Sequence, residues 1–363
     1  MSQPAIVVVI GGGYGGVSVA KALDEVADVV LVEPRDAFFH AVGALRATVD
    51  PEFLPKVFFP YDRLLSRGRV VRDRAAAVEP GRVALASGEV LAADYIVLAT
   101  GSGYPFPAKN EFLDASEARE QYADTQRQLA AAEQVVLLGA GPVGLEFAGE
   151  IKAKWPRKDV IIVDPADDIL CEYEPELREE IRRQLAALDV RLILGSPLHE
   201  EPVTRPGGLA LFQVATGAGI DVIGDIWFRC YGERPNTGYL VGALADVRHG
   251  SGRIAVTETL QVKGQDTVFA VGDITDLPES KRAGAAMRHA AVAARNITSL
   301  IEGGTPAAAY EVGPAAIVLP LGPEGGATQR LGEGVAGPEV TAQYKGADLM
   351  TGRFTQLFGL PTD

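Results

Sequence analysis

Cysteine is scarce in this chain of 363 residues, which contains two, Cys171 and Cys230. They lie far apart in the sequence and form no Cys-x-x-Cys pair, so two reduced thiols are expected rather than a redox couple. So few thiols also exclude most metal clusters, and we expect no metal site.

Basic charge and long apolar runs are lacking as well. The 34 lysines and arginines are outnumbered by 48 acidic residues, and the resulting net charge of -14 disfavours a nucleic acid as partner. No segment approaches the roughly 20 apolar residues of a transmembrane helix. The start, MSQPAIVVV, has neither the basic region nor the cleavage site of a signal peptide. We therefore expect a cytoplasmic protein with no transmembrane segment.

Glycine, in contrast, is concentrated near the N-terminus, in VVVIGGGYGGVSVA at residues 7–20. Ala5–Ile10 has the apolar run of a buried parallel strand, and Val17–Val26 is predicted to be the following helix. In the G-x-G-x-x-G spacing the first glycine makes a tight turn, the second lets the backbone approach a pyrophosphate, and the third lets the helix pack on the strand. These glycines are Gly11, Gly13 and Gly16. Glu33 ends the next strand, DVVLVEP, where its carboxylate can accept hydrogen bonds from a ribose.

The same pattern returns in VVLLGAGPVGLEFA at residues 135–148. A strand at Gln134–Leu138 and a helix at Leu145–Lys154 are predicted around a second glycine set, Gly139, Gly141 and Gly144. Asp164 ends the strand DVIIVDP, and the residues that follow, ADDIL, contain no arginine. Because a carboxylate there binds a free ribose 2′-hydroxyl and repels a 2′-phosphate, we expect NADH to be preferred over NADPH.

Two further segments are predicted to be strands of the same kind of sheet, ADYIVLATG at residues 93–101 and DTVFAVGDITD at residues 266–276. The carboxyl ends of parallel strands face the ligand crevice, so Asp273 is either a cofactor contact or a carboxylate that stabilises its own turn. The helix predicted at residues 284–301 would direct its N-terminal amides into the same crevice.

The order of these motifs, with ATG at residues 99–101 and AVGD at residues 270–273, resembles the pyridine nucleotide-disulfide oxidoreductases, flavoproteins with two dinucleotide-binding folds. Segments such as VGLEFAGEIK at residues 143–152 resemble their branch of ferroptosis-suppressor and apoptosis-inducing-factor-like quinone reductases. The resemblance implies an α/β fold with two Rossmann-like domains, the FAD domain being interrupted by the NAD domain, and a small C-terminal α+β piece. The implied ranges are 1–108 and 235–312 for FAD, 109–234 for NAD(P)H, and 313–363 for a C-terminal acceptor-access region.

The resemblance also implies which residues bind the two cofactors. FAD would be held through Gly11, Gly13, Tyr14, Gly15, Gly16, Glu33, Thr100, Gly101, Gly272 and Asp273. Amides near Ala286 and Met287 would stabilise charge on the flavin. NADH would be held through Gly139, Gly141, Pro142, Val143, Gly144, Asp164 and Gly232.

Three residues are expected to act in catalysis. Lys109 and Glu146 match the lysine and glutamate that such flavoproteins pair near the flavin N5 atom, where hydride arrives. His40 either orients a quinone or relays a proton to it, or is a structural histidine beside the pyrophosphate. Arg46 also has two interpretations, a counterion for cofactor phosphate or an ordinary helix arginine.

One departure from the family pattern determines the expected chemistry. Disulfide reductases carry their redox cysteines where this chain has HAVGALRATV, at residues 40–49, so electrons would leave the flavin directly for an external acceptor. We therefore expect an FAD-dependent NAD(P)H:quinone oxidoreductase. A tailoring flavoenzyme for a specialised metabolite and an apoptosis-inducing-factor-like NADH sensor or scaffold are the alternatives. Tyr231, in RCYGERPN, replaces the threonine that is usual in the family's turn.

The end of the chain, YKGADLMTGRFTQLFGLPTD, combines few charges with apolar residues at near-helical spacing. These residues are Leu349, Met350, Phe354, Leu357 and Phe358. One interpretation is packing in a core. The other is a hydrophobic lip for a quinone tail, or for peripheral contact with a membrane.

Overall fold

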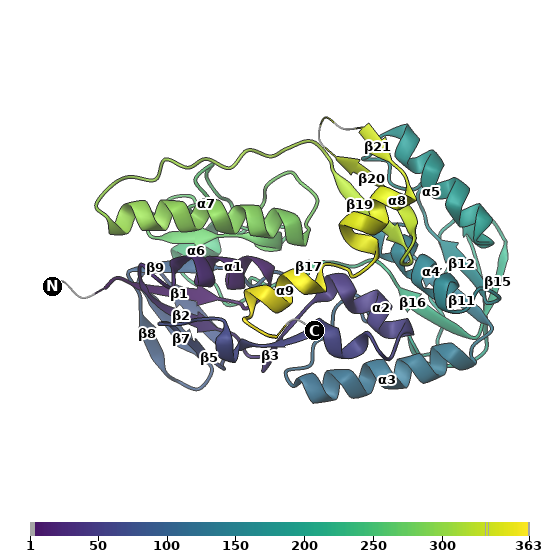
Figure 1. Ribbon diagram of the computed structural model, residues 1–363, viewed down its shortest axis with the longest axis horizontal. Helices are drawn as coiled ribbons and strands as arrows, with labels where there is room; N and C mark the ends of the chain where they lie inside the picture. The colour runs from purple at the N-terminus through teal and green to yellow at the C-terminus, as the bar shows by residue number, and fades with distance from the viewer. Residues whose placement is uncertain (1–3, 331, 333, 362–363) are drawn as a thin grey trace.

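The computed structural model describes residues 4–330, 332 and 334–361, and it has two lobes that lie side by side (Figure 1). The N-terminal lobe is built on a five-stranded parallel sheet in the order β18-β9-β1-β2-β5. Its central strands are almost continuous apolar runs, as expected where both faces of a sheet are covered. The strands are β1 (Ile6–Ile10), β2 (Asp28–Val32), β5 (Arg69–Val71), β9 (Tyr95–Leu98) and β18 (Val268–Ala270).

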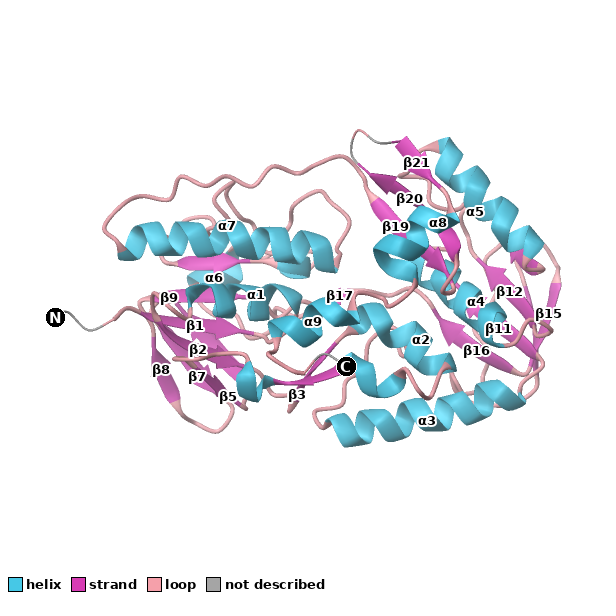
Figure 2. Cartoon of the chain, in the orientation of Figure 1, coloured by secondary structure: helices cyan, strands magenta, loops and turns pink. Residues whose placement is uncertain are grey.

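Two helices and an antiparallel meander share the core of this sheet. Helices α1 (Tyr14–Leu23) and α7 (Ala283–Ile301) contact each other on one side of it (Figure 2). Helix α1 begins at Tyr14 rather than at Val17, because the extended Gly13 is its N-cap and the third motif glycine already lies in the first turn. The meander strands are β6 (Ala75–Glu79), β7 (Arg82–Leu85) and β8 (Val90–Ala92).

The second lobe has its own parallel sheet, in the order β13-β12-β11-β16. Helix α4 begins at Pro142, before the predicted Leu145, because Gly141 is an extended N-cap and proline suits the first turn of a helix. The predicted α/β fold with two Rossmann-like sheets is confirmed. The elements are β11 (Gln134–Leu138), α4 (Pro142–Lys154), β12 (Asp159–Val163), α5 (Pro175–Ala187), β13 (Val190–Ile193), β14 (Phe212–Ala215), β15 (Asp221–Gly224) and β16 (Ile226–Arg229).

The lobes are joined by a strand pair and a helix pair. Strands β10 (Ser102–Gly103) and β17 (Arg234–Pro235) pair antiparallel. Helices α2 (Ala44–Val49) and α3 (Ala115–Ala131) pack together with a core that includes Tyr122. The short elements are β3 (Ala37–Phe39), β4 (Phe58–Pro60), η1 (Ala41–Gly43), η2 (Leu54–Val57), η3 (Tyr61–Arg63), α6 (Ala243–Asp246) and η4 (Gly272–Ile274).

The C-terminal segment contacts both lobes. Its antiparallel sheet packs on α4 and α5 and buries Leu319 and Leu321 in the core of the second lobe. Helix α9, yellow in the middle of Figure 1, buries Phe354, and Phe358 after it, in the core of the first lobe. The core-packing interpretation therefore holds for these two side chains. The elements are β19 (Ile317–Leu321), β20 (Gly325–Arg330), β21 (Gly334–Ala336), α8 (Pro338–Thr341), the π-helix η5 (Ala342–Gly346) and α9 (Thr351–Leu357).

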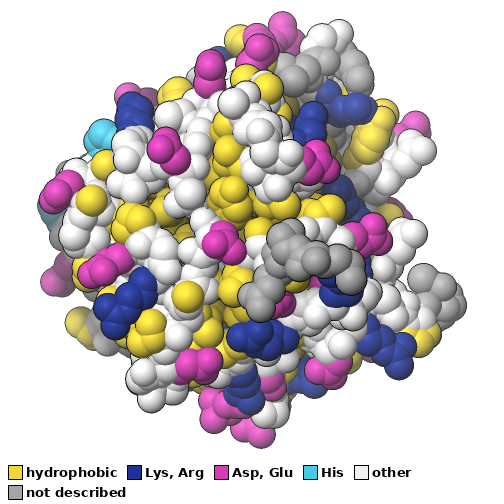
Figure 3. Space-filling model, turned by 90° about the vertical axis from the view of Figure 1, so that its left-hand side faces the viewer, with side chains coloured by type: hydrophobic (Ala, Val, Ile, Leu, Met, Phe, Trp, Pro, Cys, Tyr) yellow, Lys and Arg dark blue, Asp and Glu magenta, His cyan; other side chains and the backbone are white. Residues whose placement is uncertain are grey.

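No helix among the described residues combines the length and the apolar character needed to cross a bilayer. Figure 3 shows the face at the left-hand end of Figure 1, where acidic and basic side chains are interspersed around a central hydrophobic area. The described part of that face shows no continuous basic surface, in keeping with the acidic net charge.

Candidate active site

A cavity of about 1910 Å³ is lined by both lobes and by the C-terminal segment. Its wall combines the first glycine loop, the ends of β9 and β18, and the N-terminal ends of α4 and α7. Many of the residues predicted from the sequence come together there, namely Gly11, Gly13, Tyr14, Gly15, Glu33, Thr100, Gly101, Lys109, Pro142, Val143, Glu146, Gly272, Asp273 and Ala286. Others lie outside that wall, namely Gly16, His40, Arg46, Gly139, Gly141, Gly144, Asp164, Gly232 and Met287.

The first glycine loop has the geometry that its spacing predicts. Gly11 has a φ of 101°, and a Cβ atom on it would lie 2.5 Å from the carbonyl oxygen of Ala99. A Cβ atom on Gly16 would lie 1.8 Å from the carbonyl oxygen of Gly11, whereas one on Gly13 would meet nothing within 4 Å. Gly16 is therefore a packing position, and Gly13 leaves open space on the cavity side of the loop.

Glu33 is buried at the end of β2 and braces this loop. Its Oε2 atom accepts a hydrogen bond of 2.6 Å from the amide of Gly12, and its Oε1 atom accepts one of 3.0 Å from the amide of Arg35. The hydroxyl of Tyr61 donates to the carbonyl of Gly12 at 2.8 Å. Tyr61 was not predicted, because the short segment that carries it has no motif of its own.

Asp273 is the centre of a polar cluster at the strand ends. Its Oδ2 atom accepts hydrogen bonds from Ser102 Oγ at 2.6 Å and from Lys109 Nζ at 3.2 Å. Lys109 Nζ also donates to the Ser102 carbonyl at 2.8 Å. Lys109 thus lies beside the residue expected to hold the ribityl chain, and it does not pair with Glu146.

Glu146 pairs instead with Lys345, from the π-helix η5 of the C-terminal segment. Lys345 Nζ lies 2.6 Å from Glu146 Oε1, and both side chains line the cavity while being 16% and 14% exposed. The sequence did not predict this partner, because 199 positions separate the two residues and Lys345 belongs to no motif. The available signal was a single lysine in a tail with few charges, at residues 344–363.

His40 is buried behind the cavity wall. Its Nε2 atom is 2.7 Å from the carbonyl oxygen of Leu349, which can only accept, so Nε2 carries the proton. Nδ1 therefore accepts from the hydroxyl of Tyr14 at 3.0 Å, and that hydroxyl accepts from the amide of Val42 at 3.0 Å. Burial lowers the pKa of His40 to about 4 and raises the pKa of Tyr14. A neutral His40 therefore orients the hydroxyl of Tyr14, which does line the cavity.

Arg46 is buried between the lobes. Its guanidinium makes a bidentate ion pair with Glu150, at 3.0 and 2.8 Å, and donates to the carbonyl of Ala347 at 2.9 Å. Burial nevertheless raises the pKa of the Glu150 carboxyl. The structure therefore differs from the phosphate-counterion interpretation, because the guanidinium is held by Glu150 outside the cavity lining.

The second glycine loop repeats the geometry of the first. A Cβ atom on Gly144 would lie 1.9 Å from the carbonyl oxygen of Gly139, while one on Gly141 would meet nothing within 4 Å. Asp164 accepts hydrogen bonds from the amides of Ala140 at 2.6 Å and Ala166 at 2.8 Å, as Glu33 braces its own loop. Gly232 has a φ of 103° and adjoins Pro105.

The first turn of α7 closes one end of the cavity. Ala286 lines it, whereas Met287 packs against the core of the N-terminal lobe. His289, one turn on, is buried, accepts from the Gly272 amide at 3.0 Å and lies 2.7 Å from Glu279 Oε1. His289 therefore ties α7 to the turn that carries Asp273.

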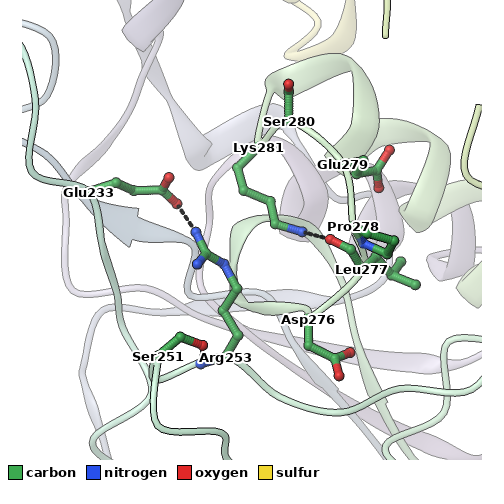
Figure 4. A pocket seen from close by; sticks show the side chains of 9 residues that line it. All are labelled: Glu233, Ser251, Arg253, Asp276, Leu277, Pro278, Glu279, Ser280 and Lys281. Carbon is green, nitrogen blue, oxygen red and sulfur yellow. Dashed lines mark hydrogen bonds and ion pairs between the residues drawn. The ribbon is translucent and has the colours of Figure 1, made fainter. Parts of the chain in front are cut away.

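A smaller recess of about 430 Å³ adjoins the cavity through the loop that precedes α7 (Figure 4). Arg253 pairs there with Glu233 at 3.2 Å, and Lys281 Nζ donates to the carbonyl of Leu277 at 2.7 Å. Burial lowers the pKa of Lys281. The recess is therefore lined by both acidic and basic side chains.

Both cysteines are free thiols, Cys171 exposed and Cys230 buried. Burial raises the pKa of Cys230 to about 12, so that this thiol is a poor nucleophile. Within the described part of the chain, no group of three or more His, Cys, Asp or Glu side chains is placed to hold a metal ion.

Sequence comparison agrees with the two dinucleotide-binding folds described above. Residues 5–295 match the family model described as pyridine nucleotide-disulphide oxidoreductase. Ferroptosis suppressor protein 1 of Taeniopygia guttata is 34% identical over 330 residues, which cover 89% of this chain and 88% of that protein. Apoptosis-inducing factor homolog B of Dictyostelium discoideum is 30% identical over 388 residues, covering 99% and 98%.

Solved structures share the fold. The sulfide:quinone oxidoreductase of Aquifex aeolicus superposes with a TM-score of 0.75 at 17% identity, covering 98% of this chain and 91% of that one. The water-forming NADH oxidase of Lactobacillus brevis, bound to NADH, gives 0.65 at 20% identity, covering 84% and 71%. An engineered form of that oxidase, bound to NADPH, gives 0.62 at 18% identity, covering 84% and 71%.

Proposed function

Because the chain belongs to the pyridine nucleotide-disulphide oxidoreductase family, we propose that this flavin-dependent NAD(P)H oxidoreductase passes electrons from NADH to a quinone. The observation that carries the proposal is the cavity of about 1910 Å³, which runs from Glu33 and the first glycine loop to the start of α4 and to the C-terminal segment.

The residues of the cavity fit FAD. Gly13 leaves open space beside the helix N-terminus, where a pyrophosphate is stabilised. Glu33 would face the ribose of the ADP half, and Asp273, held by Lys109 and Ser102, would face the ribityl chain. Bound FAD would supply an isoalloxazine ring that accepts hydride and returns electrons. The amides at the start of α7 would stabilise negative charge at that end of the cavity.

NADH would enter from the second lobe. Pro142 and Val143, at the start of α4, line the same cavity, while Asp164 ends β12 as a carboxylate beside the second glycine loop. This arrangement supports NADH over NADPH, since a 2′-phosphate would meet a negative charge.

A quinone suits the part of the wall that the C-terminal segment supplies. Val318, Tyr344 and Met350 supply apolar surface there, next to the Glu146–Lys345 pair. Lys345 would hold a proton at Nζ near the reduced acceptor, with Glu146 fixing its position. The two free cysteines form no disulfide, so electrons would leave directly for the acceptor. The name of one protein with the same fold, a sulfide:quinone oxidoreductase, includes this class of acceptor.

We place the protein in the cytoplasm, with peripheral membrane contact through the C-terminal segment. Phe354 and Phe358 are in the core, so such contact would use exposed side chains such as Tyr344, which is 49% exposed. Binding to vesicles that contain a long-chain quinone, and its loss in Tyr344→Ser, would support this route.

The experiment that tests the function is anaerobic absorbance spectroscopy of the purified protein. Adding NADH should bleach a flavin band, and adding a short-chain ubiquinone or menaquinone analogue should restore it rapidly. Bleaching without recovery would discard the quinone, and weight would pass to a tailoring flavoenzyme or to an NADH sensor.

A further inference from the structure

Arg46 touches both elements that supply the Glu146–Lys345 pair. Its two bonds to Glu150 reach α4, and its third bond reaches Ala347, directly after the π-helix η5. The side chains of Arg46 and Glu150 are only 6% and 5% exposed. Arg46 lies outside the cavity lining. It therefore contacts the backbone segments that carry Glu146 and Lys345, and not the cavity around these two side chains.

The spacing makes this contact specific. Glu146 and Glu150 are four positions apart in α4 and therefore lie on one face of the helix, a turn apart. Ala347 follows Lys345 by two positions. One guanidinium thus fixes the backbone just beyond the lysine and the helical turn just beyond the glutamate.

We propose that Arg46 is a positioning residue that sets the distance between Glu146 and Lys345 at the cavity wall. The catalytic role of this positioning rests on the function proposed above, whereas the geometry does not depend on that function. Arginine suits this place because its planar fork donates to both carboxylate oxygens while a further N–H reaches a carbonyl. A lysine offers a single point charge and would keep only part of the arrangement.

The chain provides a matched control. Lys154, at the end of α4, lies 3.5 Å from Asp50 at the end of α2, so this ion pair also joins α4 to the α2 region. Lys154 is 44% exposed, and among the described residues its ion pair is with Asp50 rather than with the C-terminal segment. Removing it weakens the same docking without touching the backbone beside Lys345.

The test measures the acetylation rate of each lysine by mass spectrometry, in FAD-loaded protein and without any substrate. The exposed Lys263 serves as the internal reference. Arg46→Met should raise the relative rate at Lys345 by about tenfold, because the pair opens when its supports separate. Arg46→Lys should give an intermediate rate, and Lys154→Met should leave the rate at Lys345 unchanged.

A drop in melting temperature with no change at Lys345 would overturn the proposal and leave Arg46 as a structural ion pair. An equal rise in Lys154→Met would overturn it too, since any loosening of α4 would then suffice. If Arg46→Met does not accumulate as folded protein, the comparison rests on Arg46→Lys, where an unchanged rate contradicts the proposal. Since no quinone is present, failure of the proposed acceptor would not affect this result.

Discussion

At the scale of single residues, burial decides which polar groups of the cavity region can change their protonation. His40 and Tyr14 form a chain with fixed donors and acceptors, because Leu349 and Val42 leave no freedom in the direction of each bond. The sequence could single out His40 as one of the four histidines of the chain. It could not show that a carbonyl of the C-terminal segment holds its Nε2 proton.

The low pKa of His40 predicts a pH-dependent stability. The unfolded residue takes up its proton near pH 6.5, whereas the folded one does so near pH 4, so the contribution is present above pH 6.5 and is lost as the pH falls to about 4. The loss amounts to about 3 kcal/mol. His40→Gln should flatten the fall of melting temperature over this range, and His199→Gln, at an exposed site, should not. An equally steep fall in both variants would contradict the assignment.

Asp164 predicts the choice of nicotinamide cofactor. Asp164→Asn keeps one of the two acceptor oxygens for the loop amides while it removes the charge, so the ratio of kcat/KM for NADH over that for NADPH should fall about tenfold or more. Melting temperature is the control for loop integrity. Equal efficiency of the unaltered protein with both cofactors would refute the preference.

At the scale of elements, the C-terminal segment supplies a cavity residue, Lys345, that the motif-bearing elements do not contain. Strands β1, β11 and β12 and the two glycine loops follow from apolar runs and glycine spacing, which are local signals. The starts of α1 and α4 were misplaced because an extended glycine as N-cap brings the next residues into the helix. The pairing of Glu146 with Lys345 depends on packing of a distant segment, which no local pattern encodes.

Lys109 and Lys345, which both line the cavity, should therefore have separable roles. Lys345→Met should lower quinone-dependent turnover by about 100-fold with FAD content retained, because a proton donor at the acceptor side is lost. Lys109→Met should instead weaken FAD binding, because Asp273 loses a partner. FAD content by absorbance and turnover with a quinone analogue distinguish the two. A selective loss of turnover in Lys109→Met would instead support the sequence-based prediction that Lys109 pairs with Glu146 near the flavin.

At the scale of the whole molecule, the C-terminal segment packs into the core of the N-terminal lobe. Phe354 stacks on Phe38 with ring centroids 5.3 Å apart and lies 4.6 Å from the ring of His40, so the tail completes the core of the first lobe. Periodicity of apolar residues predicted that the tail could be buried. It could not indicate which lobe would receive it.

Phe354→Ala should destabilise the protein by about 3–5 kcal/mol, because it leaves a cavity in a closed core. Tyr344→Ala, at an exposed position, should have little effect on stability. Thermal unfolding of both variants provides the measurement. A small effect of Phe354→Ala, together with loss of vesicle binding, would favour the hydrophobic-lip interpretation.

The return of the tail also bears on how the protein is made. The second lobe takes its parallel sheet from residues 134–229, a continuous stretch that can begin to form on the ribosome before synthesis ends. The first lobe needs β18 at Val268–Ala270 and the aromatic side chains of Phe354 and Phe358 before its core is closed. The lobe that is translated first therefore closes its core last, after Phe354 and Phe358 have been made.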